Sequence, residues 1–502
     1  MTEAVTNKSE EGSLQKMYSW LLYKFNYGFG TYKGLITFTI VWEFCIVLFL
    51  TTFSEPVKAI IGAPLFPVQL PEAERIGRII MLYHSIAVPF LVTVTYYVLE
   101  ICDVREKWGL RVKWLIFPGS ILTSASGISF AYILQHNWIV HGIFIAGLSI
   151  TFLGGVFLLI GVFPTGNFPE HNEKGPYLFG INFAQVALAL LIFCILISTI
   201  LGAAAGAYFG NGFEAFLAEH ILRLEHDIFE RAIIGHLHIM LALICTAVLL
   251  VVFRYTFPKQ EGRWYFLSII ITIPGMLIMS VGAWLVLTGL KWVHYLIYAG
   301  SGVLLLAAAI LALAGWNRTS KDVLGSSYET ASWVVRAKAV FKDPVKFGLY
   351  FQFIWVNIVM TLPGIFLAFS LEADSILTRI LKIEAFREGP EFIELTVARG
   401  HWHVLATLTA IIILLLTFDH LDVQGRVRQI MGWLLNIGSI IAFGFAVILM
   451  FYPHFDPTAN MDWAILPIDL GITLFVAGIA LFCLHQLVEI LKGKKDVLEW
   501  SE

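Results

Sequence analysis

The chain carries two near-copies of a short histidine motif, each inside a long apolar run. They occupy residues 235–238 (Gly-His-Leu-His) and 400–403 (Gly-His-Trp-His). Imidazoles are costly in hydrocarbon, and histidines in membrane segments usually mark an ion pathway, a proton relay or a bound cofactor. Residues two apart on an α-helix point about 200° away from each other. Each motif can therefore present imidazoles to two different neighbours of its helix.

The composition indicates that these motifs belong to a membrane protein. Apolar residues make up 58% of the 502 residues and charged residues 14%, with a mean hydropathy of +0.79, whereas a soluble globular chain has about 25% charged residues. The net charge of −3 gives no footprint for nucleic acid. The five cysteines form no CxxC or CxxCH motif, so no disulfide framework, zinc site or covalently attached haem is indicated. We expect an all-α integral membrane protein.

Apolar runs of about 20 residues, the length that crosses a bilayer as a helix, occur repeatedly along the chain. Twelve runs are found, at residues 34–54, 76–101, 112–135, 137–163, 178–206, 226–253, 265–289, 291–315, 345–371, 393–418, 427–452 and 464–491. The first 33 residues are polar and contain lysines, without the apolar core and cleavage site of a signal peptide. The sequence thus predicts a cytoplasmic tail at 1–33, a twelve-helix membrane domain at 34–491 and a second cytoplasmic tail at 492–502.

Basic residues between the runs predict the orientation of the helices. Lysines and arginines cluster after the second, sixth, eighth, tenth and twelfth runs. All of these segments fall on the cytoplasmic side if both termini are inside. We therefore expect a multi-pass protein of a prokaryotic cytoplasmic (inner) membrane with both termini in the cytoplasm.

In this arrangement five histidines share one depth. His84 lies about eight residues into the second run from its outer end, and the two motifs lie about ten residues into the sixth and tenth runs. At 1.5 Å per residue, all five imidazoles lie about 12–15 Å below the outer boundary. The three helices run in the same direction and are four runs apart, as a threefold repeat of four helices would require. A single buried histidine more often serves helix packing, but five at one depth favour a functional site.

Imidazoles at one depth in the outer third of a membrane suit a haem held by two axial histidines. A proton relay is a second interpretation, but relays string groups along the membrane normal and use buried carboxylates, of which these helices have almost none. A transporter with a midplane histidine cluster is a third, and it would show helices broken by glycine or proline. Pro89 and Pro274 are the only hints of such breaks.

The chain resembles, over essentially its whole length, the catalytic subunit of the haem-copper oxidase superfamily. The resemblance rests on twelve spans with both ends inside, one histidine in the second, a Gly-His in the sixth and a His-x-His in the tenth. It implies a pseudo-threefold bundle in which His84 and His403 ligate a low-spin haem and His401 is the proximal ligand of a high-spin haem. His236 stands at the position of a copper ligand in that family.

Other positions depart from the family pattern. The seventh run has no histidine where the family has a His-His pair for copper, and the nearest one is His294. Met240 replaces a tyrosine, and His238 replaces a carboxylate. Because a copper site of this kind needs about three nitrogen ligands, the sequence predicts two b-type haems without copper. Two roles stay open for His236. It is either a second axial ligand of the haem held by His401, or a ligand, with His238, His294 or Glu230, of a non-haem metal such as iron.

Two arginines are predicted to bind the cofactor as well. Arg399 lies two residues outward of His401, and Arg231 lies five residues outward of His236. Haem propionates face the outer side in the family, so both guanidinium groups can pair with them. The alternative is that these arginines extend to the membrane interface without binding a cofactor.

The predicted function is a respiratory haem oxidoreductase that passes electrons through two b-type haems, between quinol and an outer-face partner or acceptor. Expected partners are membrane lipid, a quinone or cytochrome c-like electron partner and further subunits on the outer face, but no nucleic acid. Two alternatives stay open. One is a terminal oxygen or nitric oxide reductase with an atypical metal site, and the other is the non-redox transporter.

Overall fold

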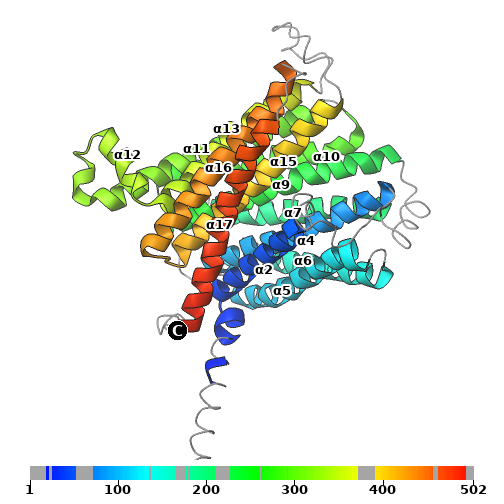
Figure 1. The fold of residues 1–502 in the computed structure, drawn as a ribbon, viewed down its shortest axis with the longest axis horizontal. Coiled ribbons are helices and arrows are strands. Elements are labelled where there is room, and N and C mark those ends of the chain that lie inside the picture. Colours follow the sequence, from blue (N-terminus) through cyan, green and yellow to red (C-terminus); the bar gives the residue numbers. More distant parts are fainter. Residues whose placement is uncertain are drawn as a thin grey trace, which may run out of the picture.

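A computed structural model of the chain consists almost entirely of helices (Figure 1). The structure describes residues 19–21, 25–52, 72–134, 137–164, 177–178, 181–209, 226–260, 262–290, 292–370, 391–455 and 462–492. The long helices are α2 (Tyr32–Thr52), α4 (Glu72–Ile101), α5 (Glu106–Ile128), α6 (Trp138–Val162), α7 (Phe183–Phe209), α9 (His226–Thr256), α10 (Arg263–Leu285), α11 (Val293–Leu324), α13 (Pro344–Ser370), α15 (Glu391–His420), α16 (Gly425–Phe455) and α17 (Asp462–Lys492).

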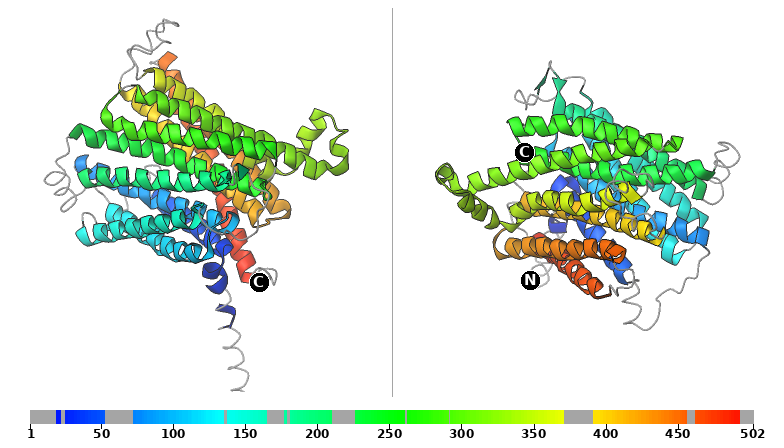
Figure 2. Two further views of the ribbon diagram at one scale, coloured as in Figure 1. Left: turned by 180° about the vertical axis from the view of Figure 1, so that it is seen from behind. Right: turned by 90° about the horizontal axis from the view of Figure 1, so that it is seen from above.

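Smaller elements lie between these helices. A nine-residue helix, α12 (Trp333–Phe341), projects from one end of the bundle with the end of α11 (Figures 1 and 2). Two-residue strands β1 (Tyr177–Leu178) and β2 (Ile181–Asn182) form one antiparallel pair.

Eleven helices in the described part of the chain are long and apolar enough to cross a membrane, and Pro344–Met360 of α13 is a shorter apolar stretch. Large apolar side chains on the outside of the bundle, such as Trp138 and Leu466, are more than 70% exposed, as expected for a surface covered by lipid. The prediction of an all-α multi-pass membrane protein is confirmed at this level. Most of the predicted tails at 1–33 and 492–502 lies outside the described residues.

Helices α4, α9 and α15, which carry the histidines, lie against one another and run in the same direction. Tyr83 and Tyr97 of α4 bond to residues 320 positions later on α15, at 3.0 and 2.7 Å. Cys245 and Tyr255 of α9 bond to residues 164 positions later on α15, both at 2.8 Å. In parallel helices, the residue numbers of contacting pairs differ by a constant amount. In antiparallel helices, their sum would be constant instead, so the observed constant differences show that the helices are parallel.

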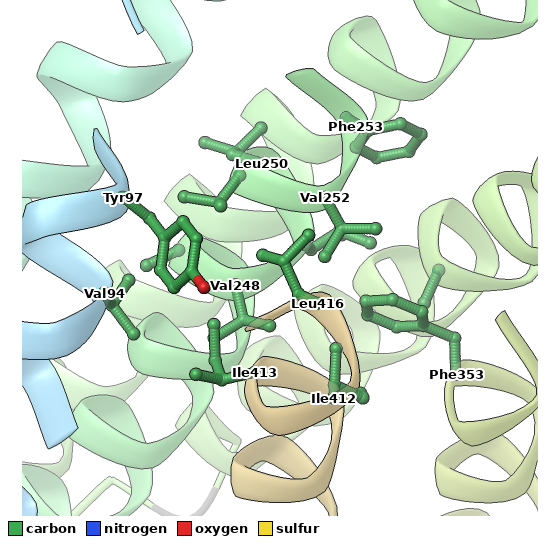
Figure 3. Packing of buried hydrophobic residues seen from close by; sticks show 14 of the residues in the cluster. Val94, Tyr97, Val248, Leu250, Val252, Phe253, Phe353, Ile412, Ile413 and Leu416 are labelled. Carbon is green, nitrogen blue, oxygen red and sulfur yellow. The ribbon is translucent and has the colours of Figure 1, made fainter. Parts of the chain in front are cut away.

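The centre of the bundle is built by α9 and α15. Every residue from 246 to 253 on α9 and from 411 to 418 on α15 is buried. A helix that is buried on all sides is covered by other helices rather than by lipid. Tyr97, Val248 and Ile413 from the three parallel helices meet in one apolar cluster (Figure 3). The two histidine motifs therefore lie on the most enclosed helices of the fold.

Candidate functional site

His84, His236 and His401 lie at matching positions on the three parallel helices. Counted from the first helical residue, they follow the start of α4, α9 and α15 by 12 (84−72), 10 (236−226) and 10 (401−391) residues. The rings of His84 and His236 are direct neighbours, with centroids 6.2 Å apart and planes inclined by only 17°. The structure thus brings together imidazoles from the second and sixth predicted runs.

Backbone carbonyl groups determine which nitrogen of each ring is protonated. The Nδ1 atom of His84 donates to the carbonyl oxygen of Ile80, and that of His236 donates to the carbonyl oxygen of Ser198 on α7, both at 2.8 Å. A carbonyl oxygen only accepts hydrogen bonds, so the proton of each neutral ring is on Nδ1 and the lone pair is on Nε2. Metal-binding histidines are held in this way, by a carbonyl or carboxylate on the other ring nitrogen.

Two glycines explain how His236 reaches this position. A Cβ atom at Gly202 of α7 would lie 2.6 Å from the Nδ1 atom of His236, so only glycine leaves room for the imidazole. Gly235 itself lies against α10, where a Cβ atom would come within 2.9 Å of the carbonyl oxygen of Ala283. The Gly-His pair of α9 therefore combines a close helix contact on one side with an imidazole directed to α7. Phe144 packs edge-on against His84, with centroids 6.1 Å apart.

The two histidines of the second motif face different helices, as their spacing predicts. His401 lies beside Gly364 of α13, where an added Cβ atom would be 3.6 Å from its Cε1 atom. The Nε2 atom of His403 is 3.0 Å from the hydroxyl oxygen of Tyr83 on α4. The structure therefore places His403 next to a tyrosine, and the predicted pairing of His84 with His403 stays a prediction from the resemblance.

The other predicted site residues lie apart from this pair or outside the described side chains. The guanidinium group of Arg231 covers Gly289 at the turn between α10 and α11, where a Cβ atom would be 2.6 Å from Nη1. His294 lies in the first turn of α11. The side chains of His238, Arg399 and Glu230 lie outside the described residues, so their predicted roles stay predictions. Within the described residues, no group of three or more His, Cys, Asp or Glu side chains is placed to hold a metal ion.

Sequence reasoning missed a polar cluster at the predicted cytoplasmic ends of the three parallel helices. The Nε2 atom of His420 lies 2.8 Å from Oε2 of Glu100, and the rings of Tyr97 and Tyr255 pack edge-on against His420. Tyr255 donates to Asp419 at 2.8 Å. The side chains come from three helices, α4, α9 and α15, and nothing in their local spacing predicts that they meet.

Arg428 of α16 completes this cluster. Its guanidinium group donates to both carboxylate oxygens of Asp343, at 3.0 and 2.7 Å, and to Oδ1 of Asp419 at 2.6 Å. Two carboxylates and one guanidinium group thus join α15 and α16 to the residue that precedes α13. Arg428 is only 8% exposed, so this contact is a structural ion pair rather than a surface one.

Comparisons of the chain with protein-family models, with curated proteins and with solved structures find no match.

Proposed function

We propose that this protein is a respiratory haem oxidoreductase that passes electrons through two b-type haems, between quinol and a partner or acceptor on the outer face. The proposal includes a pseudo-threefold, haem-copper-oxidase-like bundle of twelve helices in a prokaryotic cytoplasmic membrane, with both termini in the cytoplasm. The observation that carries it is the pair of adjacent imidazoles, His84 and His236, whose Nδ1 atoms are both held by carbonyl oxygens.

The donor set of this pair fits haem iron. Neutral imidazole nitrogens are the usual axial ligands of b-type haem, and bound haem would supply a one-electron redox centre. The two rings are direct neighbours, and each would offer its Nε2 lone pair to a haem iron. Since the Nε2 atom of His403 is engaged by Tyr83, the contacts favour His236 as the partner of His84. His401, beside Gly364, is then the ligand for the second haem.

The rest of the chain orients these rings and keeps water away. Ile80 and Ser198 hold the two Nδ1 protons, Gly202 makes room for His236, and Phe144 covers one edge of His84. Helices α4 and α10 continue through Pro89 and Pro274. A transporter that binds its substrate at broken helices would instead be interrupted there, so the continuous helices support the redox proposal.

Haem analysis of the purified protein tests the proposal directly. We expect about two haems per chain, extractable with acidic acetone because no CxxCH motif attaches them covalently. The measurement is the absorption spectrum of the extract with the protein concentration of the same sample. A double variant, His84→Leu with His401→Leu, is the control and should be nearly haem-free. A colourless wild-type protein from haem-replete cells would refute the proposal.

Carbon monoxide binding shows whether His236 closes the site. A haem iron with two imidazole ligands has no free position for a gas, so removing one ligand should create one. We expect His236→Ala to bind about one more carbon monoxide per chain than the dithionite-reduced wild type, because the haem held by His84 then has an open position. If His236→Ala and the wild type bind equal amounts of carbon monoxide, His236 is not an axial ligand, and the terminal oxygen or nitric oxide reductase becomes the better assignment.

A further inference from the structure

A carboxylic acid lies near the middle of the membrane on α2. Glu43 follows Tyr32, the start of the candidate span Tyr32–Phe49, by 11 residues, or about 16 Å in a helix. The apolar core of a bilayer is about 30 Å thick. Glu43 therefore lies close to the midplane, where ionisable residues are costly and usually functional.

The surroundings of Glu43 leave its carboxyl group without a charged partner. Its Oε1 atom is buried and has no hydrogen-bond partner among the described residues. The Thr93 hydroxyl of α4 lies beside the group, and no charged group of the described residues acts on it. An isolated carboxylate in apolar surroundings costs so much free energy that the group takes up a proton instead.

Ionisable groups on the elements around α2 do not change this conclusion. Those on its described neighbours are Tyr83, His84, Tyr96, Tyr97 and Glu100 on α4, Glu106, Lys107, Arg111 and Lys113 on α5, and Asp469, Cys483, His485 and Glu489 on α17. None of them is an electrostatic neighbour of Glu43 in the described structure. The nearest ionisable residue on the same face of α2 is Tyr32, at the predicted cytoplasmic end. Its ring lies 6.4 Å from the ring of Tyr96 on α4.

Hydroxyl groups extend from Glu43 toward that end. Thr93 donates to the Oγ1 atom of Thr39 at 2.8 Å, and both threonines are buried. Thr39 lies four residues before Glu43, one turn closer to the predicted cytoplasmic side on the same face of α2. A threonine hydroxyl both donates and accepts, so it can pass a proton on by accepting one and releasing another.

We propose that Glu43 is a proton-binding site inside the membrane, which exchanges its proton with the cytoplasmic side through the hydroxyls of Thr93 and Thr39. In the resting protein the carboxyl group is the neutral acid. On release, the proton of Glu43 passes to the Thr93 oxygen, the Thr93 proton passes to the Thr39 oxygen, and the Thr39 proton passes to water from the cytoplasmic side. Both threonines stay neutral alcohols, the water becomes hydronium and a carboxylate forms on Glu43. No electron moves, and water is the only co-reactant. The site does not depend on the proposed haem function.

Infrared spectroscopy of the full-length protein in liposomes tests this site. At neutral pH the wild type should show the carbonyl stretch of a protonated carboxyl group, which shifts in D2O. The Glu43→Gln variant should lose this band. Glu106→Gln, at an exposed position in the first turn of α5, is the matched control and should keep it. A wild type without the band, or a band unchanged in Glu43→Gln, would overturn the proposal.

Labelling with dicyclohexylcarbodiimide gives an independent readout in native membranes. This apolar reagent forms an adduct with protonated carboxyl groups in apolar surroundings, and mass spectrometry locates it. We expect an adduct on Glu43 at neutral pH and none on Glu106. The absence of an adduct on Glu43, with another membrane carboxyl labelled in the same sample, would also overturn the proposal.

The route is tested by the threonines. The double variant Thr39→Val with Thr93→Val should keep the Glu43 band but slow its exchange in D2O about tenfold, because both hydroxyl groups of the route are lost. Thr473→Val, on the exposed face of α17, is the control with normal exchange. If the double variant exchanges as fast as the wild type, the proton takes another route and this part of the proposal is wrong.

Discussion

Replacing either His84 or His236 with leucine should abolish the same haem absorption component and leave the other one unchanged. A haem held by two imidazoles depends on both nitrogens, and the structure places these two rings side by side. The measurement is the reduced-minus-oxidised spectrum of each purified variant, compared with its extractable haem. His401→Leu should remove the other component.

A third variant separates the structural pairing from the pairing that the resemblance implies. If His84 and His236 bind one haem, His403→Leu leaves their component in place. If His403→Leu and His84→Leu instead remove the same component while His236→Leu spares it, the family pairing holds and the proposed role of His236 is wrong. Comparing the three spectra decides between these results.

Gly202 offers a test that leaves every imidazole in place. The Gly202→Val variant should displace the ring of His236, because even a Cβ atom at this position would lie 2.6 Å from its Nδ1 atom. Changes in the groups that orient a metal ligand weaken binding by about 10- to 100-fold. Haem loss during dilution measures this effect, and Gly142→Val, at a position with open space around it, should behave like the wild type.

The largest effect on stability is expected for Arg428→Met. This change leaves the carboxylates of Asp343 and Asp419 facing each other without the guanidinium group that bonds to both. Breaking a buried ion pair by removing one partner costs about 3–5 kcal/mol of unfolding free energy. Unfolding in detergent micelles, followed by circular dichroism, measures the loss.

Arg426 provides the matched control for this variant. It lies two residues earlier on α16 and is exposed, so Arg426→Met should change the unfolding free energy by less than about 0.5 kcal/mol. Equal stability of the two variants would mean that the Arg428 contacts contribute nothing measurable. In that case the contacts of Arg428 with Asp343 and Asp419 would not be what holds α15 and α16 to the start of α13.

The sequence by itself determined the helices and their membrane setting. A segment of about 20 apolar residues can satisfy its backbone groups in lipid only as a helix, so local composition is sufficient to predict it. The spacing of His401 and His403 likewise determined that they face different neighbours, because helix geometry alone sets the angle between residues two apart. Each residue of a helix advances a fixed distance along the helix axis. The sequence therefore also predicted the shared depth of the histidines, counted along each run.

The tertiary structure decided which of these side chains meet. His84 lies against His236 because α7 supplies a carbonyl group at Ser198 and an empty position at Gly202, and neither leaves a recognisable signal in a single sequence. Arg428 joins residues 85 and 9 positions away, and the Thr93 hydroxyl reaches Glu43 from another helix. Hydropathy determines how deep a residue lies in the membrane, but lateral packing between helices determines its neighbours. The chemistry of this protein depends on those neighbours.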